Sequence, residues 1–482
     1  MSLSMLLLAA PEFLVLAMAC VIMCVDVFLS EERRGFIHML GMLTLIFAAI
    51  ITMRGGGIEG GVQGVTGFDG AFVRDPMADV LKLFAYVTLA LVYIYSKHYL
   101  RANRLFRADF YTLTLFSLLG AMLLISAGSL VTAYLGLELS SLSSYALVAF
   151  NRDSKPGSES AMKYFVLGSM ASGLLLYGMS LVYGATGSLQ LSIIAERVAT
   201  LGGNDILLVL GLAFLVAGIA FKLGAAPFHM WIPDVYHGAP LAATVFIATV
   251  PKLAAFALVV RLLANGLGGM HADWQQMLTL LAVLSLGVGN LAAIMQSNIK
   301  RMLAYSTISH MGFVLLGLLP GTAYGYGAAM YYVIVYALMS AAAFGMLILL
   351  SQRGVDAEML DDFKGLNQRH SWYAAVMAMV MFSMAGVPVF VGFFAKWLVI
   401  KSVLDAGQVW LAITAVVFSV IGAFYYLRVV KLMYFDQPEA SNDFRLPVDF
   451  GAAISFNGIL MLGLGVFSSS LIGICMASFG AS

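Results

Sequence analysis

Long apolar stretches separated by short polar ones make up almost the whole chain. A helix needs about 20 apolar residues to cross a bilayer core of roughly 30 Å. Stretches of this length recur from one end of the sequence to the other and predict fourteen membrane-spanning helices. Their expected ranges are 3–29, 36–54, 76–96, 109–127, 129–150, 158–184, 205–236, 240–263, 274–295, 300–318, 323–350, 371–403, 409–434 and 449–477.

Two of these spans, 205–236 and 371–403, are interrupted by Pro227 and Pro388. An interior proline removes a helix hydrogen bond and clashes with the preceding turn, so each span is predicted to break there. Freed backbone groups inside a membrane are tolerated only where protein or a water-filled cavity satisfies them. Paired breaks in two halves of a chain favour inverted repeats around a transport site. Chance alignment is the open alternative, because proline and glycine are common in membrane helices.

The predicted fold is an all-α polytopic membrane protein with two inverted five-helix repeats, each containing a broken helix. Because five is an odd number, the second copy enters the membrane from the opposite side. The expected organisation is three N-terminal helices in 1–108, a first repeat of helices 4–8 in 109–263, a second repeat of helices 9–13 in 274–434, and helix 14 in 449–482.

Basic residues indicate the orientation of these helices. Loops that follow odd-numbered spans collect lysine and arginine, and the other loops hold few. Cytoplasmic loops carry the excess of these residues, so the odd loops are expected in the cytoplasm and both termini on the opposite side of the membrane. Examples from the odd loops are Arg33, Arg34, Lys97, Arg101, Lys300 and Arg301.

Composition agrees with a membrane class, since 61% of the residues are hydrophobic and only 11% are charged. The net charge of +1 and the lack of a basic cluster interleaved with aromatic residues argue against a nucleic-acid partner. The three cysteines all fall in apolar spans, so neither a disulfide framework nor a metal site is expected from them. Packing is the expected role of these cysteines.

Five charged residues stand inside the apolar spans: Glu138, Lys163, Lys222, Lys252 and Lys396. A charge near the bilayer centre costs on the order of 3 kcal/mol, so such residues mark ion or proton pathways by default. Along one chain they predict a proton relay. By helix rise, Lys222 and Lys252 lie at a similar depth and are expected to be neighbours. For Lys163, snorkelling of the side chain to the surface stays an alternative.

Lys396 and a sixth charged residue, Lys82, have their own interpretations. Lys396 follows the second break by two turns among aromatic residues and is expected to act as a gate or exit. Lys82 lies near the start of its span together with Asp75 and Asp79. A surface salt bridge or snorkelling is therefore as good an interpretation of Lys82 as a relay role.

Two histidines are weaker candidates for the relay. His229 comes just after the Pro227 break, and His310 lies in a polar run of an otherwise apolar span. Both could extend a water-bridged path, because the charge of histidine changes near neutral pH. A hydrogen-bonded core histidine is the alternative for each.

Several runs of sequence carry a resemblance to a known family. They are KYFVLG at 163–168, YG at 177–178, LGAAPFHMWIPDVY at 223–236 and GFFAKW at 392–397. The chain resembles the subunit N family of bacterial proton-pumping NADH:quinone oxidoreductase, respiratory complex I, over nearly its whole length. It departs from the family pattern at Ala242, where proline is common.

The resemblance implies a role for each buried charge. Glu138 would be the carboxylate paired with Lys222, and Lys163 would modulate it. Lys252 would connect the two halves of the relay, and Lys396 would end it in the exit half-channel. The chain would then be a subunit of an H⁺-translocating enzyme, with no catalytic redox centre of its own.

The resemblance also implies surroundings for the chain. No cofactor is expected on it, and FMN, iron–sulfur clusters and quinone are expected on other subunits. Its partners would be other membrane subunits of complex I, including another antiporter-like subunit, and the lipid of a bacterial inner membrane. Two alternatives stay open. A subunit of a multi-subunit cation/proton antiporter would use the same lysines, and a membrane enzyme with its own active site would need a catalytic cluster.

Overall fold

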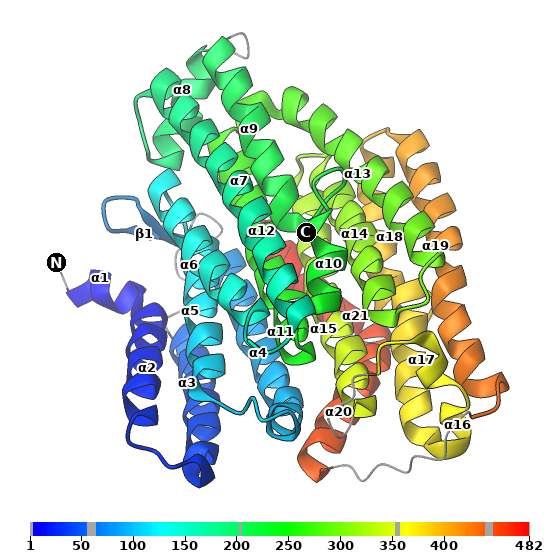
Figure 1. Cartoon of the computed structure of the whole chain (residues 1–482). Coiled ribbons are helices and arrows are strands. Elements are labelled where there is room, and N and C mark those ends of the chain that lie inside the picture. The colour runs from blue at the N-terminus through cyan, green and yellow to red at the C-terminus, as the bar shows by residue number, and fades with distance from the viewer. Residues whose placement is uncertain (1–2, 55–63, 202–204, 352–356, 439–446, 482) are drawn as a thin grey trace.

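The computed structural model describes most of the 482-residue chain (Figure 1). The outer limits of the first and last predicted domains, residues 1 and 482, lie outside the described residues. The described ranges are 3–54, 64–201, 205–351, 357–438 and 447–481.

The N-terminal part forms one group of helices with a small hairpin. Strands β1 (Val65–Gly67) and β2 (Phe72–Arg74) pair in antiparallel fashion between the third and fourth helices. The carboxylate of Asp75 caps the next helix by accepting a hydrogen bond from the Ala78 amide at 2.8 Å. The helices are α1 (Leu3–Leu8), α2 (Ala10–Asp26), the 3₁₀ turn η1 (Glu31–Arg34), α3 (Gly35–Arg54) and α4 (Pro76–Ala102).

The middle of the chain contains the first broken span. The helices are α5 (Ala108–Ile125), α6 (Leu130–Val148), α7 (Lys155–Thr186), α8 (Leu191–Leu201), α9 (Ile206–Leu223), α10 (Trp231–Gly238), α11 (Leu241–Ile247) and α12 (Val250–Val259), followed by the π-helical segment η2 (Val260–Gly266) and the 3₁₀ turn η3 (Gly268–Met270).

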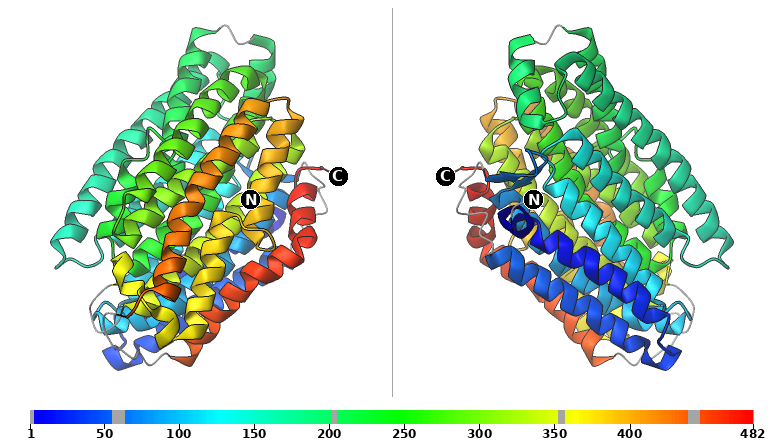
Figure 2. Two further views of the ribbon diagram at one scale, coloured as in Figure 1. Left: turned by 90° about the vertical axis from the view of Figure 1, so that its right-hand side faces the viewer. Right: turned by 90° about the vertical axis from the view of Figure 1, so that its left-hand side faces the viewer.

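The last part contains the second broken span. Helices α20 and α21 pack against α15 on the outside of the bundle, and α20 also contacts α17 and α18 (Figure 2). The elements are α13 (His271–Ile294), α14 (Ile299–Leu318), α15 (Ala323–Leu350), η4 (Leu360–Phe363), α16 (Leu366–Arg369), α17 (Ser371–Ala385), α18 (Val391–Asp405), α19 (Val409–Phe435), α20 (Val448–Val466) and α21 (Ser468–Ala477).

The prediction of an all-α polytopic membrane protein is confirmed. Ten helices in the described ranges are long and apolar enough to cross a membrane. The other four predicted spans coincide with α2, α6, α14 and the pair α17–α18. Sequence reasoning missed the short helix α8, the hairpin, and the interruption between α11 and α12.

Both predicted breaks are present, and glycine ends the helix at each. Gly224 and Gly386 have φ angles of 80° and 86°, a left-handed conformation that glycine adopts without strain. This conformation terminates α9 and α17 as a C-cap. At both places a proline follows within a few residues and prevents the helix from continuing. The chain becomes helical again in α10 after the first break and in α18 after the second.

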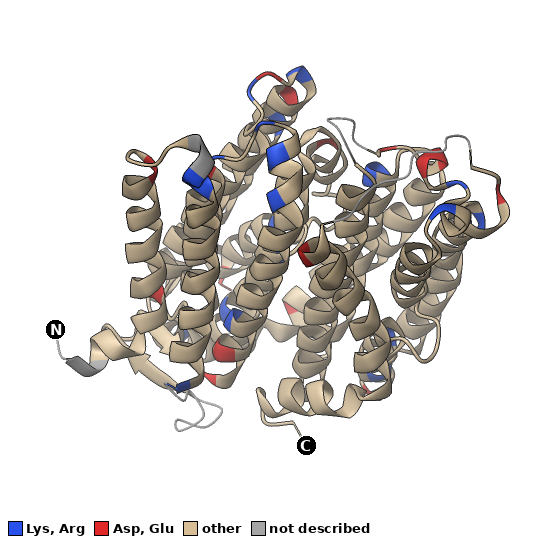
Figure 3. Cartoon of the chain, turned by 90° about the horizontal axis from the view of Figure 1, so that it is seen from below, with Lys and Arg blue, Asp and Glu red and all other residues tan. Residues whose placement is uncertain are grey.

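Two opposite faces of the bundle differ in charge. Helix α4 has 27 residues, about 40 Å of rise, and runs from the hairpin to the opposite face. Figure 3 shows lysine and arginine gathered around that opposite face, away from the hairpin. We call these the basic face and the hairpin face. Residues near both chain ends lie at the hairpin face, where Leu8 contacts β1 and Phe479 lines a cavity with Asp69.

Two helix pairs, α5–α6 and α13–α14, pack closely through glycine. A Cβ atom on Gly120 would lie 2.4 Å from the Ser140 amide nitrogen, and one on Gly289 would lie 2.6 Å from that of Ser309. Leu105, just before α5, and Lys300, in α14, line the same cavity of about 270 Å³ on the basic face. Helices α5 and α14 therefore both start at this face, and α13 runs opposite to α5.

Candidate functional site

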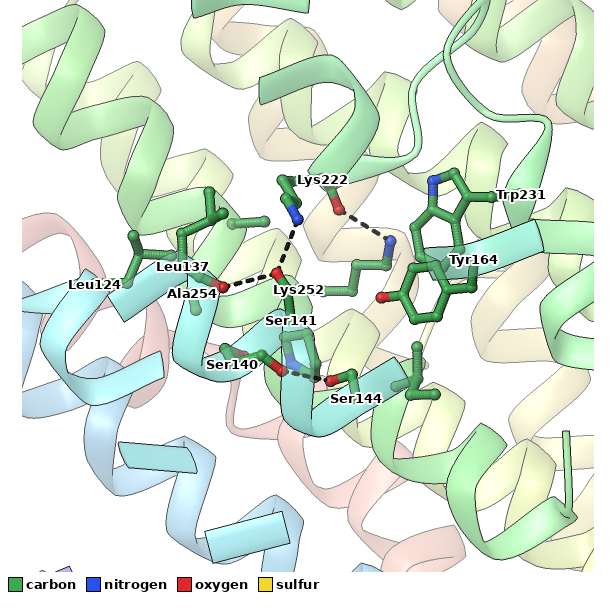
Figure 4. A pocket seen from close by; sticks show the side chains of 13 residues that line it. Leu124, Leu137, Ser140, Ser141, Ser144, Tyr164, Lys222, Trp231, Lys252 and Ala254 are labelled. Atoms are coloured by element: carbon green, nitrogen blue, oxygen red, sulfur yellow. Dashed lines mark hydrogen bonds between the residues drawn. The ribbon is translucent and has the colours of Figure 1, made fainter. Parts of the chain in front are cut away.

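Lys222 stands in the last turn of α9, directly before the first break. Its Nζ atom donates a hydrogen bond of 2.8 Å to Ser141 Oγ on α6 (Figure 4). Ser141 in turn donates to the Leu137 carbonyl at 2.7 Å. The ammonium also lies 6.0 Å from the ring centre of Tyr145. One hydroxyl and an aromatic face therefore hold this charge inside the bundle.

Lys252 approaches the same break from α12 and is 1% exposed. Its Nζ donates to the Leu223 carbonyl at 2.8 Å and lies 3.4 Å from that of Lys222. The last carbonyls of a helix lack partners within the helix and carry partial negative charge, so an ammonium is favourable there. The indole ring of Trp231 lies 4.9 Å away. The predicted proximity of Lys222 and Lys252 is therefore present.

A cavity of about 40 Å³ joins the two lysines. This volume is enough for at least one water molecule, and the lining supplies hydroxyl and ammonium partners. Figure 4 shows both lysines and the α6 serines around it. The polar lining residues are Ser140, Ser141, Ser144, Tyr164, Lys222 and Lys252.

Glu138 lies on α6, one turn before Ser141, and is half-buried. Among the residues that the structure describes, no ion pair joins Glu138 to Lys222, whose Nζ donates to Ser141 instead. The Glu138 Oε1 atom is buried without a hydrogen-bond partner there. Any exchange of a proton between Glu138 and Lys222 must therefore cross a gap.

Lys163 occupies a more exposed position than the other charges, with 45% of its side chain accessible. Its Nζ lies 2.9 Å from both Glu159 and Asp234. Asp234 also accepts a hydrogen bond of 3.0 Å from Arg301 on α14. Lys163 thus contacts these carboxylates in place of Glu138.

Lys396 repeats at the second break what Lys252 does at the first. Its Nζ donates to the carbonyl of Ala385, the last residue of α17, at 2.8 Å. A second hydrogen bond of 2.9 Å reaches Ser419 Oγ on α19. The ring of Phe313 lies 5.1 Å from the ammonium. Each broken helix therefore has a buried lysine bound to its final carbonyl.

His310 lies on α14 and contacts a hydroxyl with each ring nitrogen. Nδ1 is 2.8 Å from Tyr332 Oη, and Nε2 is 3.0 Å from Tyr426 Oη. Tyr426 also lies 2.5 Å from Ser306 Oγ. A neutral imidazole donates with one nitrogen and accepts with the other, so His310 can pass a proton between these two tyrosines.

His229 lies in the loop between α9 and α10 and is half-buried. Its Nδ1 atom is buried and has no hydrogen-bond partner within the described ranges. Unlike His310, it does not belong to a tyrosine network.

Sequence reasoning missed the hydroxyl partners of this site. Ser141, Ser419, Tyr332 and Tyr426 each contact a predicted relay residue. The run SSLSSY at 140–145 offered a signal, because four serines within five residues are unusual in an apolar span. Isolated residues such as Ser419 gave no such signal.

The expectation of a surface position for Lys82 is wrong. Lys82 is 1% exposed, and its Nζ lies 2.6 Å from Glu12 on α2. The neighbouring acids have other partners, since Asp75 pairs with Arg261 at 2.6 Å and Asp79 with Arg74 at 3.1 Å. Helix α2 covers Lys82 and supplies a carboxylate from a distant part of the sequence.

Within the described residues, no group of three or more His, Cys, Asp or Glu side chains could hold a metal ion. The lysine, histidine and hydroxyl side chains of the site described above can each donate a hydrogen bond.

Comparisons with known proteins agree with this arrangement. Residues 127–422 match the family described as NADH:quinone oxidoreductase/Mrp antiporter, TM. The NADH-quinone oxidoreductase subunit N of Thioalkalivibrio sulfidiphilus is 53% identical over 462 residues, covering 96% of this chain and 95% of that protein.

Solved structures give the same result. A chain of respiratory complex I from Thermus thermophilus with bound aureothin has a TM-score of 0.82 and 31% identity, covering 96% of this chain and 98% of its own. A chain of the Mrp complex from Dietzia sp. shares the fold, with a TM-score of 0.85 at 19% identity and coverage of 99% and 97%. The chain therefore belongs to the subunit N family of NADH-quinone oxidoreductase, antiporter-like membrane subunits of complex I.

Proposed function

We propose that this chain carries protons across the bacterial inner membrane through Glu138, Lys222, Lys252 and Lys396, driven by quinone reduction elsewhere in the complex. The observation that carries this proposal is the matched pair of buried lysines at the broken helices. Lys252 donates to the Leu223 carbonyl and Lys396 to that of Ala385, both at 2.8 Å. A structural role alone does not account for two buried charges at two helix breaks.

The first half of the relay would start at Glu138. A proton would pass to Lys222 and then through the 40 Å³ cavity to Lys252. Lys222 and Lys252 line the same cavity, so their positive charges repel each other. This repulsion would drive the proton onward when Lys222 is recharged.

The second half would lead from Lys252 to Lys396 by way of His310. Two tyrosines are candidates for the steps between them: Tyr236, whose buried hydroxyl has no hydrogen-bond partner in the described residues, and Tyr336, which donates to Thr307 on α14 at 2.8 Å. His310 stands one turn further along α14, and the ring of Phe313, a further turn on, lies 5.1 Å from the Lys396 ammonium. His229, whose Nδ1 has no hydrogen-bond partner among the described residues, is a second candidate at the first break.

Lys163 would modulate Glu138, as the family resemblance implies. In this conformation Glu159 and Asp234 hold its ammonium. Lys163 would therefore act on Glu138 only after it leaves these carboxylates, which makes its position a switch between two partners.

The proposed domains are the N-terminal helices in 1–108, two inverted repeats in 109–263 and 274–434, and the last helix in 449–482. The opposite directions of α5 and α13 and the similar breaks after α9 and α17 support this division. By the positive-inside rule the basic face would be cytoplasmic, and both termini would then be periplasmic.

The chain would act as a non-redox subunit of an H⁺-translocating NADH:quinone oxidoreductase. FMN, iron–sulfur clusters and quinone would reside on other subunits, and no cofactor would bind to this one. Its partners would be other membrane subunits of complex I, including another antiporter-like subunit, and the bilayer. Nucleic acid would not be a partner.

Replacement of Lys396 by methionine in the assembled complex tests the proposal. Lys401→Met is the matched control, because Lys401 lies on the same helix with an exposed side chain. Proton pumping and NADH oxidation are measured in membrane vesicles, and native gels verify assembly. We expect loss of pumping for Lys396→Met alone. Normal pumping by this variant would refute its relay role.

A cation/proton antiporter subunit is the second candidate, favoured by the shared fold of the Mrp complex chain. This function predicts sodium-dependent proton transport without NADH. Two measurements separate the functions. Transport in vesicles that contain the tagged chain tests for sodium dependence, and a native gel tests whether the chain co-migrates with NADH dehydrogenase activity, as only a complex I subunit should.

A further inference from the structure

A group of hydroxyl side chains connects α5 to the Lys222 cavity. Ser117 Oγ on α5 lies 3.1 Å from Ser140 Oγ and 3.2 Å from Ser144 Oγ on α6. All three side chains are buried. Ser140 and Ser144 also line the cavity that contains Lys222 and its partner Ser141. This cluster of hydroxyl side chains therefore reaches the cavity of the first buried lysine.

This group continues from Ser117 toward the basic face. Thr114 lies one helical turn earlier on α5, on the same side as Ser117. Its Oγ1 atom is 2.8 Å from Tyr93 Oη on α4, and neither side chain is exposed. The hydroxyls thus pass from the first predicted repeat to the N-terminal helices.

The outer end of the group is a histidine. The ring centres of Tyr93 and Tyr111 are 4.8 Å apart, and Tyr111 Oη lies 3.1 Å from His38 Nδ1. His38 is half-buried in the first turn of α3, which starts beside Arg101 at the basic face. His38 therefore stands where protons from the basic face could reach these hydroxyl side chains.

Serine in a membrane helix often only satisfies a carbonyl of its own helix. Ser143 is such a residue, since its Oγ donates to the Leu139 carbonyl at 2.8 Å. Ser117 differs because, besides donating to the Ser140 carbonyl at 3.0 Å, its Oγ meets two hydroxyls of another helix. The close approach of α5 and α6 already follows from Gly120, so packing does not require these hydroxyls.

We propose that these hydroxyl side chains, together with His38, form the inlet path by which protons move from the basic face to Lys222. The inference rests on the proposed function and assigns the outer half of the path to the N-terminal helices α3 and α4. The residues of the inlet path are His38, Tyr111, Tyr93, Thr114, Ser117, Ser140, Ser144 and Ser141.

Hydroxyl groups suit this task because each one donates and accepts a hydrogen bond. A proton that arrives at one side of a hydroxyl oxygen releases the original proton at the other side, so one proton moves and none is consumed. Water in the 40 Å³ cavity would carry the step from Ser140 and Ser144 to Ser141 and Lys222. The path has two gaps, one between Thr114 and Ser117 and one between Tyr111 and Tyr93, whose hydroxyl donates to the Tyr111 backbone carbonyl at 3.4 Å. A side-chain rotation or one water molecule would close each of them.

Removal of single oxygen atoms tests the inlet path in the assembled complex. Tyr93→Phe is nearly isosteric, and Tyr95→Phe is the matched control. Tyr95 is also fully buried on α4, but its hydroxyl contacts Asn457, outside the inlet path. Ser144→Ala and Ser143→Ala form a second pair. We expect Tyr93→Phe and Ser144→Ala to slow pumping about tenfold, a conservative value for loss of a proton-transfer group.

Three results decide the inference, with assembly verified on native gels and Lys222→Met measured alongside. If Lys222→Met loses pumping while Tyr93→Phe and Ser144→Ala pump normally, the inlet path is wrong and the proposed function stands. If Lys222→Met also pumps normally, the proposed function fails. Equal losses in Tyr95→Phe and Ser143→Ala would reduce the hydroxyls to packing and overturn the inlet path.

Discussion

The ammonium nitrogen of Lys82 lies 2.6 Å from a carboxylate oxygen of Glu12, and both side chains are buried between α4 and α2. Burial removes the hydration of both ions, so each depends on the other. The pair stands within the N-terminal helices, away from the lysines at the two breaks.

Replacement of Glu12 by glutamine should strongly destabilise the chain, because it leaves the Lys82 charge buried without a counter-ion. Removal of one partner of a buried pair typically costs about 3–5 kcal/mol. The expected result is a lower thermal unfolding midpoint in mild detergent and less assembled complex. Fluorescence-detected thermal unfolding measures the first quantity and native gels the second.

The double variant Glu12→Leu with Lys82→Met is the control for this prediction. Replacement of both ions by apolar residues of similar volume is often neutral or stabilising. Stability should therefore return close to that of the parent chain, with pumping retained. A double variant as unstable as Glu12→Gln would show that Glu12 acts through shape or another partner.

The helix positions followed from the sequence because span length is a local property. Pro227 and Pro388 marked both breaks correctly, and Lys222 and Lys252 were correctly expected to be neighbours. The ion pair of Lys82 was missed because Glu12 lies 70 positions earlier in the sequence, on a different helix. The contacts of Lys163 with Asp234 and of His310 with Tyr426 likewise depend on how distant helices pack.

Gly386 should be essential for the position of Lys396. Its φ of 86° disfavours any other residue by about 1–2 kcal/mol. A Cβ atom would also lie 2.8 Å from the Lys396 side chain. Gly386→Ala should therefore lower both stability and pumping. Gly173→Ala on α7 is the control, because a Cβ atom there meets open space. Equal pumping by the two variants would contradict the prediction.

Glu358 on the basic face should make stability depend on acidic pH. Burial alone would raise the pKa of Glu358, but its hydrogen bond with His237 and the charge of Lys300 lower that pKa from 4.5 to about 2. A depressed carboxylate pKa in the folded state means that the carboxylate stabilises the fold above its unfolded pKa. This contribution should be lost as the pH falls from 4.5 to about 2.

Thermal unfolding midpoints at pH 7 and pH 3, compared between the parent chain and Glu358→Gln, measure this effect. Glutamine does not titrate, so the variant should be less stable at pH 7 and should lose less stability on acidification. The same pH dependence in both proteins would exclude Glu358 as the titrating group.

Tyr332 should matter for proton transfer at His310, whereas its neighbour Tyr331 should not. Tyr332 Oη lies 2.8 Å from His310 Nδ1, while the buried hydroxyl of Tyr331 has no hydrogen-bond partner in the described part of the chain. Tyr332→Phe removes one of the two hydroxyls that His310 contacts, so pumping should slow about tenfold, a conservative value beside the roughly 10²–10⁴-fold that a positioned proton-transfer group contributes. Tyr331→Phe removes an unpaired buried polar atom and should leave stability unchanged or slightly higher.

Pumping rates of the two variants are compared in membrane vesicles. The two tyrosines are adjacent on α15, and each variant loses one oxygen atom. If both variants pump at the parent rate, His310 does not relay protons through Tyr332, and the path to Lys396 must use other groups.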